Sequence, residues 1–202
     1  MEKKIITISR EFGSGGRTVG HMVAERLGIP FYDKELVDQI ALESGFAPKF
    51  VEENGEHSPG SSLFSYAFAP QGVPGIMNGL STADFLWNIQ CSVILQLAEK
   101  GPCVIVGRNA DYILKEYDHC LRVFVHADRS WRLLRIRKEM PDVPLSVLES
   151  DMDTADRARR AYCEKMTGRT YGDSRNYDLT LCISSLGFEK AYQLLKEAAE
   201  IV

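Results

Sequence analysis

Residues 5–20 read IITISREFGSGGRTVG, and this stretch decides the fold class. Its first four residues are β-branched, which is typical of a short buried strand. Glycines follow at positions 13, 15 and 16, and apolar residues then recur at helical spacing, at Val19, Met22, Val23 and Leu27. The stretch therefore predicts a strand, a glycine loop and a helix in succession.

The rest of the chain continues to alternate strand and helix patterns. Further strands are predicted at 29–32, 103–106, 121–126 and 179–183. Helices are predicted at 34–44, 82–100, 145–166 and about 188–199, with another that Asp128 could cap. Such alternation is typical of an α/β protein whose parallel sheet is covered by helices on both faces. With no internal repeat and no clear boundary, residues 1–202 are predicted to form a single domain.

Residues 45–80 differ from the rest in being rich in Gly, Ser, Pro and Asn, with scattered aromatic residues. Loops of this length are uncommon in compact domains and are often functional. The composition favours a substrate-binding insertion, and a long surface loop is the alternative.

The composition excludes several classes of protein. A net charge of −4 lacks the basic surplus that duplex nucleic acid requires. No apolar run is long enough for a membrane span or a signal peptide, so a cytoplasmic protein is expected. The five cysteines are widely spaced and include no C-x-x-C pair, which fits free thiols in a reducing compartment: Cys91, Cys103, Cys120, Cys163 and Cys182.

The glycine loop is the candidate phosphate-binding site. Glycines let successive backbone N–H groups turn toward one anion, and the dipole at the N-terminus of the following helix favours negative charge. The hydroxyl of Thr18 stands where a nucleotide-bound Mg²⁺ would be met. A tight glycine turn that binds nothing is the alternative. The candidate residues are Gly13, Ser14, Gly15, Gly16, Arg17 and Thr18.

The loop departs from the P-loop pattern G-x-x-x-x-G-K-[ST], because it has no lysine. Arg17 precedes Thr18 directly. If the loop is instead set against the GSGKGT loop of nucleoside monophosphate kinases, Gly16 replaces the lysine and Arg17 replaces a glycine. In either case the loop lysine is absent, and with Gly16 at the lysine position Arg10 occupies the place of the pattern's usual first glycine. Arg17 can supply the missing positive charge through its two-pronged guanidinium group.

Two other functions could also use this glycine loop. A dinucleotide-binding oxidoreductase would use Gly13 and Gly15 with Asp33 at the end of the second strand, but Thr18 stands where its third glycine belongs. A nucleotide sensor that binds without turnover would explain the missing lysine.

Four segments together resemble the bacterial cytidylate kinase-like proteins: ITISREFGSGG, IPFYDKELV, VIVGRNADYIL and DRARRAYCEKMTGRTYGDSRNYDLTLCI. The resemblance extends along nearly the whole chain. It implies the P-loop nucleoside monophosphate kinase fold, with five parallel strands in the order 2-3-1-4-5. It also implies phosphoryl transfer from ATP with Mg²⁺ to a small-molecule partner, a nucleoside monophosphate such as CMP or dCMP.

The resemblance implies roles for individual residues as well. Arg108 is similar to the arginine of a GRD segment that grips the acceptor phosphate, and Asn109 replaces the aspartate of that segment. Asp33 is similar to an acceptor-site aspartate, or it is simply the N-cap of helix 34–44.

The resemblance also implies an arginine-bearing lid, expected at 145–176, with Arg157, Arg159 and Arg160 as its catalytic arginines. Cations stabilise the charge that moves in phosphoryl transfer, and closure of such a segment excludes water. A solvated helix face, on which Arg160 pairs with Glu164, is the alternative. Thr18 would hold Mg²⁺ largely with water and ATP oxygens, because the third strand lacks a terminal aspartate.

Overall fold

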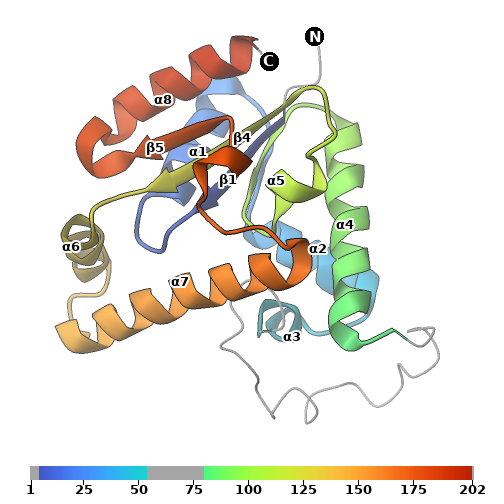
Figure 1. Ribbon diagram of the computed structural model, residues 1–202, viewed down its shortest axis with the longest axis horizontal. Coiled ribbons are helices and arrows are strands. Elements are labelled where there is room, and N and C mark those ends of the chain that lie inside the picture. The colour runs from blue at the N-terminus through green and yellow to red at the C-terminus, as the bar shows by residue number, and fades with distance from the viewer. Residues whose placement is uncertain (1–4, 54–79, 202) are drawn as a thin grey trace.

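Five parallel strands form one sheet in the order β2-β3-β1-β4-β5, which confirms the predicted strand order. The computed structural model describes residues 5–53 and 80–201 (Figure 1). The strands are β1 (Ile5–Arg10), β2 (Phe31–Tyr32), β3 (Cys103–Val106), β4 (Cys120–His126) and β5 (Leu179–Cys182). Every residue of the central strand β1 is buried, because helices cover both faces of the sheet.

The two faces of the sheet carry different helices. α1 (Gly16–Leu27) and α8 (Ile183–Ile201) pack on one face, against Ile6 and Ile8 of β1. The other face packs against α2 (Lys34–Ser44), α3 (Pro48–Glu53), α4 (Thr82–Lys100) and α5 (Ala110–Ile113), with Ile5 in that core. The alternation along β1 thus sends successive side chains into opposite layers.

A third group of helices lies across the carboxyl ends of the strands. α6 (Arg129–Glu139) and α7 (Leu145–Thr167) pack together around Ile136, Leu148 and Met152, and Phe12 of the glycine loop joins this cluster. In Figure 1, α7 runs beneath the sheet as one long helix. The loop after β1 is therefore covered by α6 and α7, which do not belong to either face of the sheet.

Two predicted strands are shorter in the structure, because at one end of each the backbone pairs with or enters a neighbouring helix. The second strand was expected at 29–32, but the Ile29 N–H bonds to the Ala24 carbonyl at 3.0 Å and so closes α1. The fifth strand ends at Cys182 because Ile183 begins α8, in which Gly187 is non-helical. Asp128 stands at the N-cap of α6, but its side chain makes no capping bond. Of the predicted insertion at 45–80, α3 is helical, and residues 54–79 lie outside the described residues.

The structure also bears on the expectations about membrane spans and cysteines. No helix within residues 5–53 and 80–201 combines the length and the apolar character needed to cross a membrane. All five cysteines fall within the described residues, and each is a free thiol.

The five thiols should differ in reactivity. Burial raises the pKa of Cys103 and of Cys120 to about 12, whereas hydrogen bonds with the Ser184 and Ser185 hydroxyls lower the pKa of the half-buried Cys182. Since the thiolate is the nucleophile, we expect iodoacetamide at neutral pH to modify Cys182 before Cys103 and Cys120. Peptide mass spectrometry over time measures the order, and Cys182→Ser should remove the fast product. Equally fast labelling of Cys103 in folded protein would contradict this assignment.

Candidate active site

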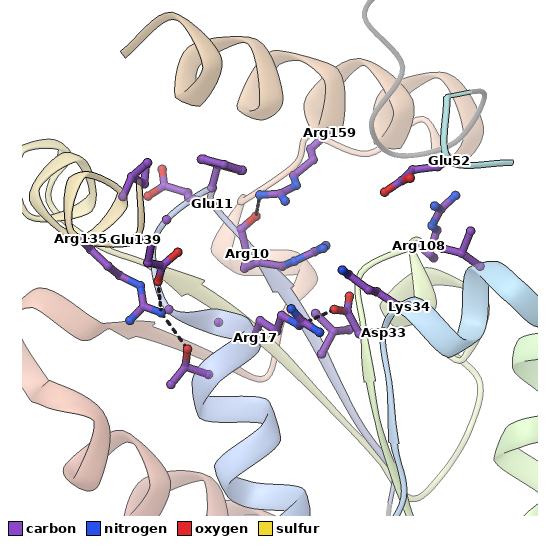
Figure 2. A pocket seen from close by; sticks show the side chains of 18 of the residues that line it. Arg10, Glu11, Arg17, Asp33, Lys34, Glu52, Arg108, Arg135, Glu139 and Arg159 are labelled. Carbon is purple, nitrogen blue, oxygen red and sulfur yellow. Dashed lines mark hydrogen bonds and ion pairs between the residues drawn. The ribbon is translucent and has the colours of Figure 1, made fainter. Parts of the chain in front are cut away.

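A cavity of about 600 Å³ opens at the carboxyl ends of β1 and β3, beside the glycine loop. Figure 2 shows side chains reaching it from the loop, α2, α6 and α7. Its charged lining consists of six cationic and four acidic side chains: Arg10, Arg17, Lys34, Arg108, Arg135, Arg159, Glu11, Asp33, Glu52 and Glu139. The cavity is therefore locally cationic although the whole chain carries a net charge of −4.

The glycine loop turns tightly around its own backbone. Gly13 and Gly15 adopt left-handed conformations, with φ of 73° and 88°. A Cβ atom at Gly15 would also lie 2.6 Å from Cε1 of Phe188, so two independent constraints require glycine there. The first intrahelical bond of α1 joins the Val19 N–H to the Gly15 carbonyl at 2.9 Å. The N–H groups of residues 16–18 precede that bond, at the positive end of the helix dipole.

Ser14 stabilises the loop from inside. Its hydroxyl lies within hydrogen-bond distance of two carbonyl oxygens, at 2.9 Å from Glu11 and 3.1 Å from Val125 of β4. The residue is fully buried. Of the six predicted loop residues, Ser14 alone does not line the cavity, and its hydroxyl instead fixes the turn to the sheet.

Thr18 meets an arginine that the sequence did not single out. Nη2 of Arg135 donates a hydrogen bond to the Thr18 hydroxyl at 2.9 Å and also lies 3.1 Å from Glu139 (Figure 2). A hydroxyl oxygen has two lone pairs, so Thr18 can accept this bond and still coordinate a cation. Arg135 therefore brings a cation from α6 to the start of α1.

Arg17 and Asp33 form an ion pair across the cavity. Nε of Arg17 lies 2.6 Å from Oδ2 of Asp33, and the Arg17 side chain is 59% exposed. Asp33 stands at the N-cap of α2, but its side chain makes no capping bond there. Its carboxylate instead orients Arg17 from the end of β2.

Three arginines of the lining are buried: Arg10 is 8% exposed, Arg108 3% and Arg159 5%. Nη1 of Arg159 donates to the Arg10 carbonyl at 3.2 Å, which joins α7 to the end of β1. Nη1 of Arg108 donates to the Val51 carbonyl at 3.3 Å, which joins the loop after β3 to α3. Arg108 and Asn109 both have positive φ, 58° and 53°, an uncommon backbone for residues other than glycine.

The remaining predicted residues lie away from this cavity. Asn109 is buried at the N-cap of α5 and is not part of the lining. Arg157 is exposed and donates to the Thr154 hydroxyl at 3.1 Å, while Arg160 lines a second hollow beside Glu11 and Tyr171. Residues 157, 159 and 160 point in different directions because each helical step rotates the side chain by about 100°. Of the three, only Arg159 lines the cavity.

Sequence reasoning missed the contributions of Lys34, Arg135 and Glu139, and noted Arg10 only as a departure from the loop pattern and a second candidate for its missing charge. Lys34 directly follows the candidate Asp33, which was a usable signal. Arg135 belongs to a strongly basic helix, RSWRLLRIRKE, in which no spacing distinguishes it from its neighbours. Its place in the site depends on the packing of α6 against Phe12 and the loop, which is a tertiary contact.

The sequence model of the cytidylate kinase-like family matches residues 5–185. The chain belongs to this family. The match covers the glycine loop, Arg108 and the whole of α7. Curated protein sequences gave no match.

Solved structures share the fold over nearly the full length of the chain. A protein of uncharacterised function from Eubacterium ventriosum is 25% identical, with a TM-score of 0.73 and coverage of 98% of this chain and 99% of that chain. Shikimate kinase from Bacteroides thetaiotaomicron is 18% identical, with a TM-score of 0.55 and coverage of 98% of each chain. A gluconokinase from Sinorhizobium meliloti is 18% identical, with a TM-score of 0.53 and coverage of 98% of this chain and 94% of that chain. These likenesses establish the P-loop kinase fold.

A buried ion pair fixes the loop beside the site. Asp156 of α7 accepts from the Phe12 N–H at 2.7 Å and pairs with Arg132 at 2.6 Å, and Arg132 donates to the Phe12 carbonyl at 3.0 Å. The side chains of Asp156 and Arg132 are only 7% and 8% exposed.

Removing one partner of this pair should destabilise the protein strongly. Asp156→Ala leaves Arg132 buried without its close carboxylate, a loss of about 3–5 kcal/mol in the free energy of unfolding. Asp153→Ala on the same helix, which breaks the exposed pair of Asp153 with Arg129 of α6, should lose less than about 1 kcal/mol. Urea unfolding of both variants measures the difference, and equal losses would refute this role for Asp156.

Proposed function

We propose that this protein transfers a phosphoryl group from ATP to a nucleoside monophosphate, with CMP or dCMP as the first acceptors to test. The observation that carries the proposal is the placement of three buried arginines around one cavity beside a glycine loop. Cations that are shielded from water act on an anion in the cavity with less screening than exposed cations do. A ligand carrying several phosphates is the kind of anion that such a lining attracts.

The donor phosphates fit the glycine loop. The N–H groups before Val19 lie at the positive end of the α1 dipole, and the left-handed glycines keep side chains out of the turn. The Thr18 hydroxyl would hold Mg²⁺ together with water, since residues 5–53 and 80–201 contain no cluster of three or more acidic, histidine or cysteine ligands. Bound ATP–Mg²⁺ would supply the phosphoryl group that is transferred. These residues fit a nucleotide whose metal ion is held mainly by its own phosphates.

The acceptor fits the opposite side of the cavity. Arg108 lies at the end of β3, and the Arg17–Asp33 pair lies between it and the glycine loop. The Arg108 guanidinium can bind an acceptor phosphate through two parallel hydrogen bonds. Asn109, the buried residue that follows Arg108, would act by holding the backbone of that turn in its left-handed form.

Catalysis would rest on positioning and on cations around the transferred group. Arg159 lines the cavity from α7, and its bond to the Arg10 carbonyl ties it to the end of β1. We propose residues 145–176 as the lid, with Arg159 as its inward-facing cation and with Arg157 and Arg160 approaching only if α7 shifts. The surrounding side chains would exclude water from the transferred group.

A panel of acceptors tests the reaction class. We expect the protein, given ATP and Mg²⁺, to convert one or more nucleoside monophosphates into diphosphates. The panel contains the monophosphates of all common bases, including CMP and dCMP. Shikimate and gluconate belong in the same panel, because proteins of this fold are named for them. Transfer only to a hydroxyl of such a small molecule would contradict the nucleotide acceptor. ATP binding without transfer to any acceptor would favour a nucleotide sensor, and NAD binding in place of ATP would favour an oxidoreductase.

Arg108→Lys tests the acceptor assignment. Lysine keeps the positive charge but lacks the two-pronged geometry, so the KM for the acceptor should rise about 10-fold or more, while the affinity for ATP changes little. Lys115→Arg, at an exposed residue that follows α5 and does not line the cavity, is the matched control and should behave as the parent protein. A changed ATP affinity with an unchanged acceptor KM would place Arg108 on the donor side instead.

A further inference from the structure

We propose that Arg10 takes the place of the lysine that the glycine loop lacks, so that Arg10 and Gly16 form an exchanged pair. This inference rests on the proposed function, because it assigns the Arg10 guanidinium to the donor phosphates. The pattern G-x-x-x-x-G-K, with its lysine set at position 16, places its two glycines at positions 10 and 15. The chain has Gly15, but it carries arginine where the first glycine stands and glycine where the lysine stands.

The two positions are coupled sterically. A Cβ atom at Gly16 would lie 2.6 Å from Cβ of Arg10, closer than real Cβ atoms approach, and 3.1 Å from its Cγ, which is also tight. Gly16 itself begins α1 and is absent from the residues with positive φ, so its backbone would accept any amino acid. Glycine is therefore required at position 16 because the Arg10 side chain fills the space.

The Arg10 side chain enters the cavity from a fixed starting point. Ile6, Ile8 and Arg10 alternate onto the face of β1 that α1 covers, so Arg10 lies against the first residue of that helix. The Tyr171 hydroxyl binds both the N–H and the carbonyl of Arg10, at 3.0 and 2.9 Å. From there the side chain extends into the cavity toward Lys34 (Figure 2). The geometry thus brings a cation from β1 into the cavity beside position 16, where the pattern has its lysine.

Arg17 is placed differently. Its guanidinium is held at 2.6 Å by Asp33, and its side chain is largely exposed, whereas Arg10 is 8% exposed. A buried cation acts on a phosphate with less screening by water than an exposed one. Arg10 is for this reason the better replacement for the lysine.

Melting temperatures test the steric coupling without any ligand. Gly16→Ala should lower the melting temperature, and adding Arg10→Gly should recover most of that loss. Adding Arg10→Ala instead should not, because the alanine Cβ atoms at positions 10 and 16 still approach to 2.6 Å. Val125 lies 3.3 Å from the new Cβ, so only a small adjustment remains in the recovered pair. An undiminished melting temperature for Gly16→Ala would overturn the coupling.

Removing the positive charge at position 10, and restoring it at position 16, tests the role of Arg10. Arg10→Met keeps the stem against Gly16 and removes the cation, so ATP binding with Mg²⁺ should weaken and phosphoryl transfer should fall about 100-fold. Arg10→Gly should lose ATP affinity and phosphoryl transfer as Arg10→Met does. The double variant Arg10→Gly with Gly16→Lys should recover both ATP affinity and phosphoryl transfer. Arg17→Ala should lose less than Arg10→Met in ATP affinity measured by calorimetry.

The outcomes separate this inference from the proposed function. If the parent protein binds ATP and folded Arg10→Met binds it equally tightly, the inference is wrong and the proposed function stands. Failure of the exchanged pair to recover ATP affinity, at a melting temperature near that of the parent, would likewise overturn it. A parent protein that binds no ATP would overturn both.

Discussion

The turn that joins β1 to α1 is the constraint on which the rest of the site depends. Between Arg10 and Gly16 the chain leaves a fully buried strand and begins a helix, and each backbone group on the way needs a partner. Asp156 and Arg132 bind the N–H and the carbonyl of Phe12, and Ser14 anchors the far side of the turn to β4. With those groups bound from behind, the N–H groups at the start of α1 face the cavity.

The cations of the site are buried because two helices cover the end of the sheet. α6 and α7 cover the carboxyl ends of the strands, which are otherwise open in a sheet of this kind, and both Arg10 at the end of β1 and Arg159 of α7 are buried there. The chain as a whole is acidic, so attraction of a polyphosphate depends on this local surplus and not on net charge. The same enclosure lowers the screening of each charge by water, which strengthens its effect on a bound anion.

The fold could be predicted from the sequence because its signals are local. The β-branched run at Ile5–Ile8, the following glycines and the regular alternation of patterns each depend on neighbours in the chain, and helices 34–44 and 82–100 were predicted to the residue. The site could be predicted only in part. The loop residues and Arg108 carry motifs, but Arg135 reaches Thr18 through the packing of α6, and the role of Arg10 depends on its contact with Gly16. The contact of Arg135 leaves no pattern in the linear sequence, and the sequence shows that Arg10 and Gly16 depart from the P-loop pattern but not that they touch.

The central claim is that this loop holds the phosphates of a nucleotide. A crystal structure with Mg²⁺ and a non-hydrolysable ATP analogue tests it most directly. The account predicts the β- and γ-phosphates against the backbone N–H groups of Gly13–Thr18, with the Arg10 guanidinium in contact with a phosphate oxygen. A nucleotide bound elsewhere, with this loop covered by its own side chains, would contradict the account.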